Sequence, residues 1–222
     1  MLLFASINSY ASADVGKWMV TETNITCLIV QMDIKLNFTY TTAANASKAV
    51  SYVIPANVTS VDAIGSHCGD KEDTIKVSWK EGNHFEMVFK TNNSKYDLSS
   101  FVITLNTSSL FTDSAVNQTL TLLYTNESFD IPSNFSYHCN SEQQLNATDG
   151  SSLFFVSKVQ FEAFKKDNEK KFSAAKDCDS NITPDIVPIA VGISLIALIV
   201  VVLIAYIVGR RRQQARGYLN IM

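Results

Sequence analysis

The sequence has few histidines and cysteines, two residue types that build many metal and catalytic sites. It contains three histidines (His67, His84 and His138) and four cysteines, and no two cysteines lie at the close spacing of a zinc knuckle. Ser66-His67-Cys68 is the only cluster that resembles a nucleophile beside a base, and the histidines form no motif with a nucleophile and an acid. We therefore expect no metal site, no cofactor and no enzymatic activity.

Positive charge is scarce outside the C-terminus. The last fourteen residues hold four of the eighteen basic residues and none of the twenty-one acidic ones, so the rest of the chain has fourteen basic against twenty-one acidic residues. A surface with such an acidic excess does not attract nucleic acid. We expect no nucleic-acid partner.

One long segment carries no charge. Residues 189–208 read IAVGISLIALIVVVLIAYIV, and as a helix rising about 1.5 Å per residue they span the roughly 30 Å hydrocarbon core of a bilayer. The alternative is a buried core helix, which would need a large soluble domain around it. Arginines follow at 210–212 and aspartates precede the segment, and basic flanks stay cytoplasmic. We predict a transmembrane helix over residues 186–208 that places the N-terminal bulk in a lumenal or extracellular space.

The first thirteen residues, MLLFASINSYASA, are interpreted as a secretory signal peptide that ends in the small-residue pattern Ala11-Ser12-Ala13. This leader lacks a basic residue after Met1, and polar residues interrupt its apolar run. The remaining chain is long enough for one lumenal domain. We expect a signal peptide over 1–13, a glycosylated lumenal β domain over 14–185, and a cytoplasmic tail over 209–222.

Apolar and polar residues alternate repeatedly in this expected domain. The segment 34–40 alternates strictly, which is the period-two pattern of a half-buried strand. Residues 75–79 and 85–89 alternate on either side of Gly82, which predicts a β-hairpin. No lumenal segment shows a convincing stripe of period 3.6. We predict an all-β domain of two packed antiparallel sheets.

Three polar stretches are interpreted as connections between strands. Residues 106–118 and 140–152 are expected to be loops. The charged run 165–171 is expected to be a solvated turn rather than a binding patch.

The four cysteines all lie on the expected lumenal side, where the environment is oxidising. They are Cys27, Cys68, Cys139 and Cys178. We expect two disulfides, for which three connectivities are possible. The spacings of forty-one and thirty-nine residues favour two successive, similar loops. A metal site is the rival interpretation, because a histidine precedes two of the cysteines.

Asparagine in the sequon Asn-x-Ser/Thr is strongly over-represented. Eleven sequons occur where chance would give about three, at Asn24, Asn37, Asn45, Asn57, Asn92, Asn106, Asn117, Asn126, Asn134, Asn146 and Asn181. N-linked glycans at these positions would keep proteases off the polypeptide and block sheet edges. The alternative is that these are polar strand and turn residues that happen to match the sequon.

The C-terminal tail contains a short peptide motif. Tyr218-Leu219-Asn220-Ile221 has a tyrosine, two variable residues and a bulky aliphatic residue, and it follows Gly217. An extended peptide of this kind can place its ring and its aliphatic side chain in two pockets of a receptor. We interpret the motif as a sorting signal in an unstructured tail; the alternative is an inert tail.

Short segments of the chain together match the pattern of one family. They are Thr26-Cys27-Leu28 running into Gln31-Met32 and Leu36-Asn37, Val159 to Phe164 before Asp177-Cys178, Pro188 to Gly192, Leu203 to Arg210, and Gly217-Tyr218-x-x-Ile221. On these segments, residues 17–222 resemble the lysosome-associated membrane glycoproteins, the LAMP family. The resemblance implies one β-prism-like domain of two sheets, and it implies the disulfides Cys27–Cys68 and Cys139–Cys178.

The resemblance also implies a function. It implies a type I membrane glycoprotein of the lysosomal and late endosomal limiting membrane, transiently at the plasma membrane, that forms a protective glycan coat. Clathrin-adaptor medium chains would bind Tyr218 and Ile221, with Gly217 biasing the destination. The chain departs from the family's best-known members in two ways. Those members have two such domains, whereas one is expected here. They also end at the aliphatic residue, whereas Met222 follows Ile221 in this chain.

Two further possibilities stay open. The protein could instead be a surface or endosomal cargo or adhesion receptor that cycles through the endocytic pathway. A homo-oligomer through the lumenal domain or the helix is also possible, since Ala190 and Ser194 form a small-xxx-small pair.

Overall fold

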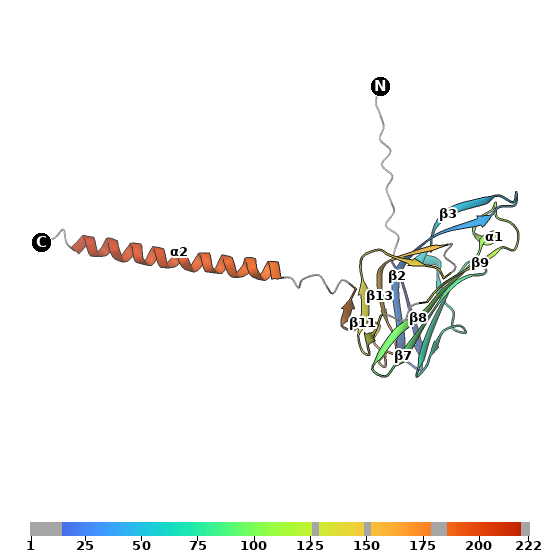
Figure 1. Ribbon diagram of the computed structural model, residues 1–222. Helices are drawn as coiled ribbons and strands as arrows, with labels where there is room; N and C mark the ends of the chain where they lie inside the picture. The colour runs from blue at the N-terminus through green and yellow to red at the C-terminus, as the bar shows by residue number, and fades with distance from the viewer. Residues whose placement is uncertain (1–14, 126–128, 149–151, 179–185, 219–222) are drawn as a thin grey trace, which may run out of the picture. The chain divides into compact units, whose positions relative to one another are not determined.

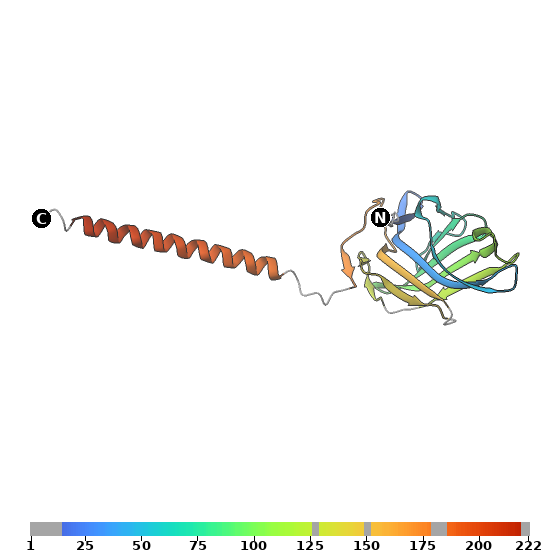
Figure 2. The same ribbon diagram turned by 90° about the horizontal axis from the view of Figure 1, so that it is seen from above.

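The computed structural model describes residues 15–125, 129–148, 152–178 and 186–218. The chain divides into two units, Met1–Cys178 and Asp179–Met222. The first unit consists of two β-sheets that pack face to face (Figures 1 and 2). The second unit contains one long helix (Figure 1).

The first sheet contains seven of the described strands. Its main order is β1 (Gly16–Glu22), β2 (Ile25–Thr41), β13 (Leu153–Glu162), β11 (Ser136–Cys139) and β14 (Ala175–Asp177), with β3 (Ser47–Val53) paired to β2 and β12 (Gln143–Asn146) paired to β13. The pair β11–β14 is parallel, and the other pairs in this sheet are antiparallel.

The second sheet also contains seven described strands. Its main order is β10 (Ile131–Pro132), β8 (Lys95–Asn106), β7 (Asn83–Asn92), β6 (Glu72–Trp79) and β4 (Ser60–Val61), with β5 (His67–Cys68) paired to β6 and β9 (Thr119–Tyr124) paired to β8. All of these pairs are antiparallel. Two short helices, η1 (Ala56–Val58) and α1 (Thr107–Leu110), lie in the connections.

Aromatic side chains from both sheets fill the space between them. Phe89 of the second sheet lies 5.1 Å from Phe161 of the first, measured between ring centroids, and Phe101 lies 5.8 Å from Phe154. All four are fully buried. Each comes from the apolar positions of an alternating strand, because successive side chains of a strand point to opposite faces. The predicted two-sheet β fold is therefore confirmed.

The predicted hairpin around Gly82 is also confirmed. It joins β6 to β7, whose end residues Trp79 and Asn83 pair with each other. Gly82 has a φ of +79°, which glycine adopts without steric cost. A side chain would also be crowded here, because a Cβ on Gly82 would lie 3.1 Å from Asn106 Cβ.

Two of the expected loops contain regular structure. The stretch 106–118 includes α1, and the stretch 140–152 includes β12. Strand β12 has no run of apolar residues, but its backbone pairs with β13 from Gln143↔Val156 to Asn146↔Leu153. Pairing with a neighbour overrode a weak local signal, as it does for many short strands.

The charged run after β13 is only partly the solvated turn that we expected. Residues 163–173, here called the strap, first continue beside β2, where Thr26 N donates to Asp167 O at 2.8 Å and Lys165 N to Cys27 O at 2.9 Å. The strap then returns over the outer face of the first sheet, where Ser173 N donates to the Glu162 carboxylate at 2.7 Å. Residues 166–171 are exposed, as expected. The Lys165 side chain, however, is only 3% exposed, and it pairs with the carboxylates of Glu162 and Asp167. The interpretation of Lys165 as a solvated residue was wrong.

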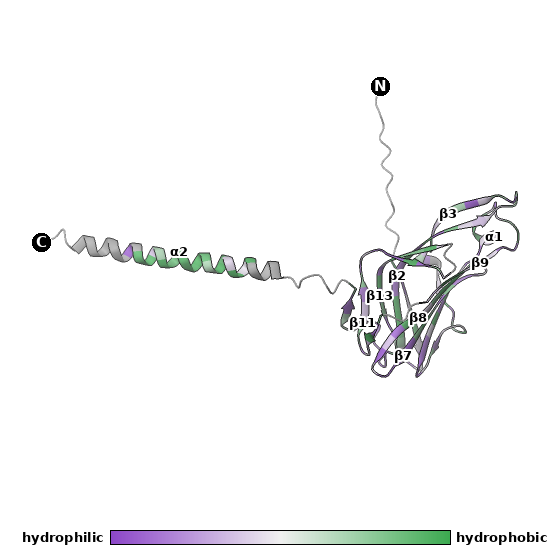
Figure 3. Cartoon of the chain, in the orientation of Figure 1, coloured by the Kyte–Doolittle hydropathy of each residue, from purple (hydrophilic) through white to green (hydrophobic). Residues whose placement is uncertain are grey.

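The helix α2 (Ile186–Tyr218) contains the predicted transmembrane segment. Residues Val191–Val208 are long and apolar enough to cross a membrane, and Figure 3 shows their apolar character. The helix then continues to Tyr218, although we expected an unstructured tail from residue 209. Arginine, glutamine and alanine favour helix, and cations near a helix C-terminus interact favourably with its dipole. The expected signal peptide lies outside the described residues.

Candidate functional site

Both disulfides occur in the pairs that the resemblance implies. Cys27 on β2 is bonded to Cys68 on β5, which links the two sheets, with a Cα–Cα distance of 5.8 Å. Cys139 on β11 is bonded to Cys178, with a Cα–Cα distance of 5.1 Å. In the chain-entropy model each loop of about forty residues contributes about 4 kcal/mol. The second bridge anchors the last segment of the β domain.

The cluster Ser66-His67-Cys68 is engaged in structural contacts. Ser66 Oγ accepts a hydrogen bond from Lys76 N at 3.0 Å, and Cys68 is held in its disulfide. The His67 ring is 70% exposed and lies 3.5 Å from a carboxylate oxygen of Glu22. The serine and the cysteine of the cluster therefore serve the fold.

Most of the sequon asparagines lie on the surface of the β domain. Nine of the eleven are in the described residues. Asn37 and Asn106 are half-buried, and seven are exposed: Asn24, Asn45, Asn57, Asn92, Asn117, Asn134 and Asn146. Asn126 and Asn181 lie outside the described residues. The exposed amides are sterically open to a bulky hydrated glycan.

Four of these asparagines have a second role in the backbone. Asn24, Asn45, Asn117 and Asn134 have φ values between 57° and 71°. This left-handed conformation is strained for most residues and is tolerated by asparagine. The turns therefore give an independent reason for asparagine at these positions.

Two sequon hydroxyls also have structural roles. Thr26, in the sequon of Asn24, is buried and lies 3.3 Å from Thr21 Oγ1. Ser136, in the sequon of Asn134, is fully buried and accepts a hydrogen bond from Gln160 Nε2. For these two sequons, turn geometry and packing account for the asparagine and the hydroxyl together.

A buried carboxylate organises the region around the first disulfide. Asp73 is 1% exposed and accepts hydrogen bonds from Phe164 N at 2.6 Å and from Gly69 N at 3.0 Å. Phe164 has a φ of 58°, a strained value for an aromatic residue. Asp73 thus holds a strained turn at the start of the strap. Burial raises the pKa of Asp73 above its usual range, against the two backbone donors, which lower it.

We expect His84 to make the stability of the domain sensitive to pH. Burial, and secondarily the nearby Lys76, lower the pKa of His84 below its usual 6.5. His84 therefore binds a proton more tightly in the unfolded chain than in the folded chain. The contribution of neutral His84 to folding stability is present above pH 6.5 and is lost as pH falls through the lowered pKa. We expect the melting temperature of His84→Gln to rise relative to that of the wild type as pH falls from 7 to 5.

Asp73 acts in the opposite direction, because its raised pKa favours the folded state as pH falls. Both proteins in this comparison keep Asp73, so the difference between their thermal melts isolates the histidine. Parallel melting curves at the two pH values would contradict the assignment to His84.

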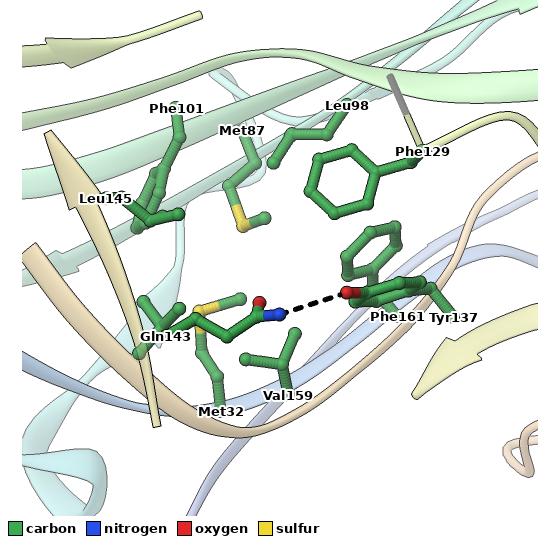
Figure 4. A pocket seen from close by; sticks show the side chains of 11 residues that line it. Met32, Met87, Leu98, Phe101, Phe129, Tyr137, Gln143, Leu145, Val159 and Phe161 are labelled. Atoms are coloured by element: carbon green, nitrogen blue, oxygen red, sulfur yellow. Dashed lines mark hydrogen bonds between the residues drawn. The ribbon is translucent and has the colours of Figure 1, made fainter. Parts of the chain in front are cut away.

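A small cavity lies between the sheets near β12. It has a volume of about 20 Å³, is lined mainly by methionine, leucine, valine and aromatic side chains, and contains the hydrogen bond from Gln143 Nε2 to Tyr137 Oη at 3.2 Å (Figure 4). This volume accommodates about one water molecule. In this conformation the cavity is far smaller than a typical ligand pocket.

The structure places part of the motif that we interpret as a sorting signal at the end of α2. Gly217 and Tyr218 are the last two residues of the helix. Ile221 lies outside the described residues, so its position relative to Tyr218 is not described. Binding in an extended form would require the last turn of α2 to unwind.

Sequence reasoning missed the buried carboxylates. Asp73 is the second residue of β6, two positions before the alternating segment 75–79, and Glu162 is the last residue of β13. The available signal was the phase of the alternation, since Asp73, Ile75 and Val77 share one buried face of β6. A charged residue in a buried phase indicates a partner from another segment.

Two family models match the chain. Residues 5–179 match the luminal domains of proteins like lysosome-associated membrane glycoprotein 2, and residues 187–218 match the transmembrane segment of lysosome-associated membrane glycoprotein 2. Together they cover nearly the whole sequence.

Curated relatives and solved structures agree with these models. The chain is 32% identical to lysosome-associated membrane glycoprotein 1 of Rattus norvegicus over 218 residues, covering 93% of this chain and 48% of that protein. It is 27% identical to lysosome-associated membrane glycoprotein 2 of Homo sapiens over 206 residues, covering 92% and 46%. The chain thus spans about half the length of the curated relatives it matches.

The fold is similar to solved domains of such proteins. The membrane-proximal domain of mouse lysosome-associated membrane protein 1 superposes with a TM-score of 0.61 at 25% identity, covering 75% of this chain and 98% of that one. The membrane-distal domain of mouse lysosome-associated membrane protein 2 gives 0.63 at 21% identity, covering 74% and 99%. The second likeness concerns the fold alone.

Proposed function

Since the chain belongs to the lysosome-associated membrane glycoprotein family, we propose that it is a type I glycoprotein of the lysosomal and late endosomal limiting membrane. In this role its β domain faces the lumen and bears a protective coat of N-linked glycans. The observation that carries the proposal is the set of seven exposed sequon asparagines on a domain with two disulfides. Bulky hydrated glycans at these positions restrict protease access to the backbone.

Charge supports the proposed orientation. The arginines at 210–212 and 216 lie beyond the apolar span Val191–Val208, and such clusters stay in the cytoplasm. The two disulfides fit the opposite, oxidising side. We propose residues 1–13 as a signal peptide, 14–185 as the lumenal part and 209–222 as the cytoplasmic part.

The partner that we propose for the tail is the medium chain of a clathrin adaptor. Tyr218 and Ile221 would enter separate pockets of an adaptor that adds the peptide as a strand, with Gly217 influencing the destination. Because α2 runs to Tyr218, the adaptor would select the fraction of tails whose last turn is open.

We propose neither catalysis nor a helix dimer. The contacts of Ser66 and Cys68 serve the fold. Within α2, Ser194 Oγ donates to Val191 O at 2.8 Å. The hydroxyl is therefore satisfied inside its own helix, which removes one reason for the small-residue pair to associate with a second helix.

The proposal is tested on full-length protein tagged at its C-terminus and expressed in cultured cells. We expect it to copurify with intact lysosomes and to migrate well above its 24.5 kDa polypeptide mass until N-glycans are removed. External protease should remove the tag from intact lysosomes but leave the β domain. A β domain that is cleaved while the tag survives would contradict the orientation.

The competing function is a cargo or adhesion receptor at the surface or in endosomes. Steady-state location at the cell surface, together with saturable binding of a soluble ligand by the wild-type protein, would favour that function over the protective coat.

A further inference from the structure

The outer face of the first sheet, which is turned away from the second sheet, is covered over only part of its area. The strap covers one part: Glu162, the register partner of Ile29, accepts a hydrogen bond from Ser173 N of the strap, and Ile29 is fully buried. A second part carries half-buried Leu153 and Phe155 of β13 and Val53 of β3, which is 45% exposed.

The strand register sets a sequon asparagine on each side of Leu153. Asn146 of β12 pairs with Leu153, and Leu153 pairs with Asn37 of β2. The alternate residues Leu36 and Phe154 are fully buried in the core, so all three residues of this row point to the outer face. Directly opposed Cβ atoms in such pairs are about 5 Å apart. Phe155 is the next outward residue along β13.

The two asparagine side chains lie along this surface. Asn37 is half-buried, and its Oδ1 is shielded from solvent without a hydrogen-bond partner in the part of the chain that the structure describes. Asn146 Oδ1 accepts a hydrogen bond from Gln144 Nε2 at 3.1 Å, a contact with its neighbour on the same face of β12. A sugar attached to either amide nitrogen therefore starts beside Leu153 rather than in open solvent.

We propose that the first N-acetylglucosamine residues at Asn37 and Asn146 pack against Leu153 and the edge of Phe155, and so complete the outer face of the sheet. This inference rests on the proposed glycosylation of the lumenal domain. The C–H face of the sugar ring removes apolar area from water. Its N–H and O–H groups supply donors near the buried Asn37 Oδ1, whose desolvation is otherwise uncompensated.

Phe155 already has one partner. Lys35 Nζ lies 5.8 Å from the centre of the Phe155 ring, a distance typical of a cation–π contact. Leu153 is therefore the main contact of both sugars. These two glycans differ from the one proposed at Asn45, which lies at an exposed turn between β2 and β3.

The test compares full-length variants made in cells that add uniform high-mannose glycans, after endoglycosidase H has trimmed each glycan to one sugar. Thr39→Ala removes the sequon of Asn37, and Thr39→Ser keeps it. We expect Thr39→Ala to melt about 2–4 °C below Thr39→Ser, and Thr148→Ala to do the same against Thr148→Ser for Asn146. Ser47→Ala, which removes the Asn45 sequon, should melt within about 1 °C of the wild type.

A second comparison isolates the contact. In a Leu153→Thr background the difference between Thr39→Ala and Thr39→Ser should disappear, because the apolar partner of the sugar is gone. An equal loss in all three sequon variants, or a loss that persists without Leu153, would overturn the packing.

Peptide mass spectrometry separates this inference from the proposed function. Unmodified Asn37 and Asn146 in a protein that still reaches lysosomes with other glycans would overturn the packing alone. A protein without glycans at any sequon would contradict the proposed coat itself.

Discussion

Replacing Tyr218 by alanine is expected to move the protein from lysosomes to the plasma membrane. The tyrosine ring is the largest anchor that the tail offers, and truncating such an anchor costs about 2 kcal/mol or more, which is about 30-fold in affinity. The readout is the fraction of full-length protein at the surface, measured by biotinylation and by overlap with an acidic-organelle dye. Surface protein should become the major pool.

Two matched variants in the same motif sharpen this prediction. Ile221→Ala removes the second anchor and should reproduce the effect of Tyr218→Ala. Asn220→Ala changes a variable position of the motif and should leave the protein in lysosomes. If Tyr218→Ala remained lysosomal, the tail would not carry the sorting signal, and family membership would still stand on the lumenal and transmembrane matches.

Replacing Glu162 by alanine is expected to destabilise the β domain by about 3 kcal/mol. The Glu162 and Lys165 side chains are 2% and 3% exposed and are 3.8 Å apart. The Glu162 carboxylate also accepts hydrogen bonds at 2.7 Å from both the backbone N and the hydroxyl of Ser173. Removing one partner of a buried pair leaves the other desolvated, at a cost of about 3–5 kcal/mol. The lower value applies because Lys165 keeps Asp167, at 2.7 Å.

Urea unfolding and thermal melting measure this loss, which corresponds to a fall in melting temperature of about 6–12 °C. Limited proteolysis gives a second readout, because a loosened strap should be cut within residues 166–171. The matched control is Glu169→Gln, an exposed charge in the same strap, which should change stability by less than about 0.5 kcal/mol. A Glu162→Ala protein that unfolds like this control would show that the strap does not depend on the carboxylate.

The strap also shows why parts of the fold escaped prediction. The run 165–171 contains many charges, and its composition predicts that its side chains are exposed to solvent. This prediction is confirmed for residues 166–171. Lys165 is buried because its backbone bonds to Cys27 O and its side chain meets carboxylates on both sides. The backbone contact joins Lys165 to Cys27, which is far away in the sequence, so no local pattern records it.

The sequons illustrate the same division. Their excess over chance could be read directly, but a sequon does not distinguish Asn45 at an exposed turn from Asn37 beside Leu153. Likewise, the motif Tyr-x-x-Ile could be read in the tail, whereas the continuation of α2 to Tyr218 could not.

The sequence by itself determined the elements whose signals are local. Period-two alternation specifies strands because successive side chains point to opposite faces, and an uncharged run of twenty residues specifies a membrane span because it matches the thickness of the hydrocarbon core. Apart from the hairpin of β6 and β7, the tertiary structure alone decided which strands pair, that Cys27–Cys68 links the two sheets, and that Lys165 and Asp73 are buried. These properties depend on contacts between segments that are distant in the sequence. Such contacts form, and stabilise the chain, only when it has folded.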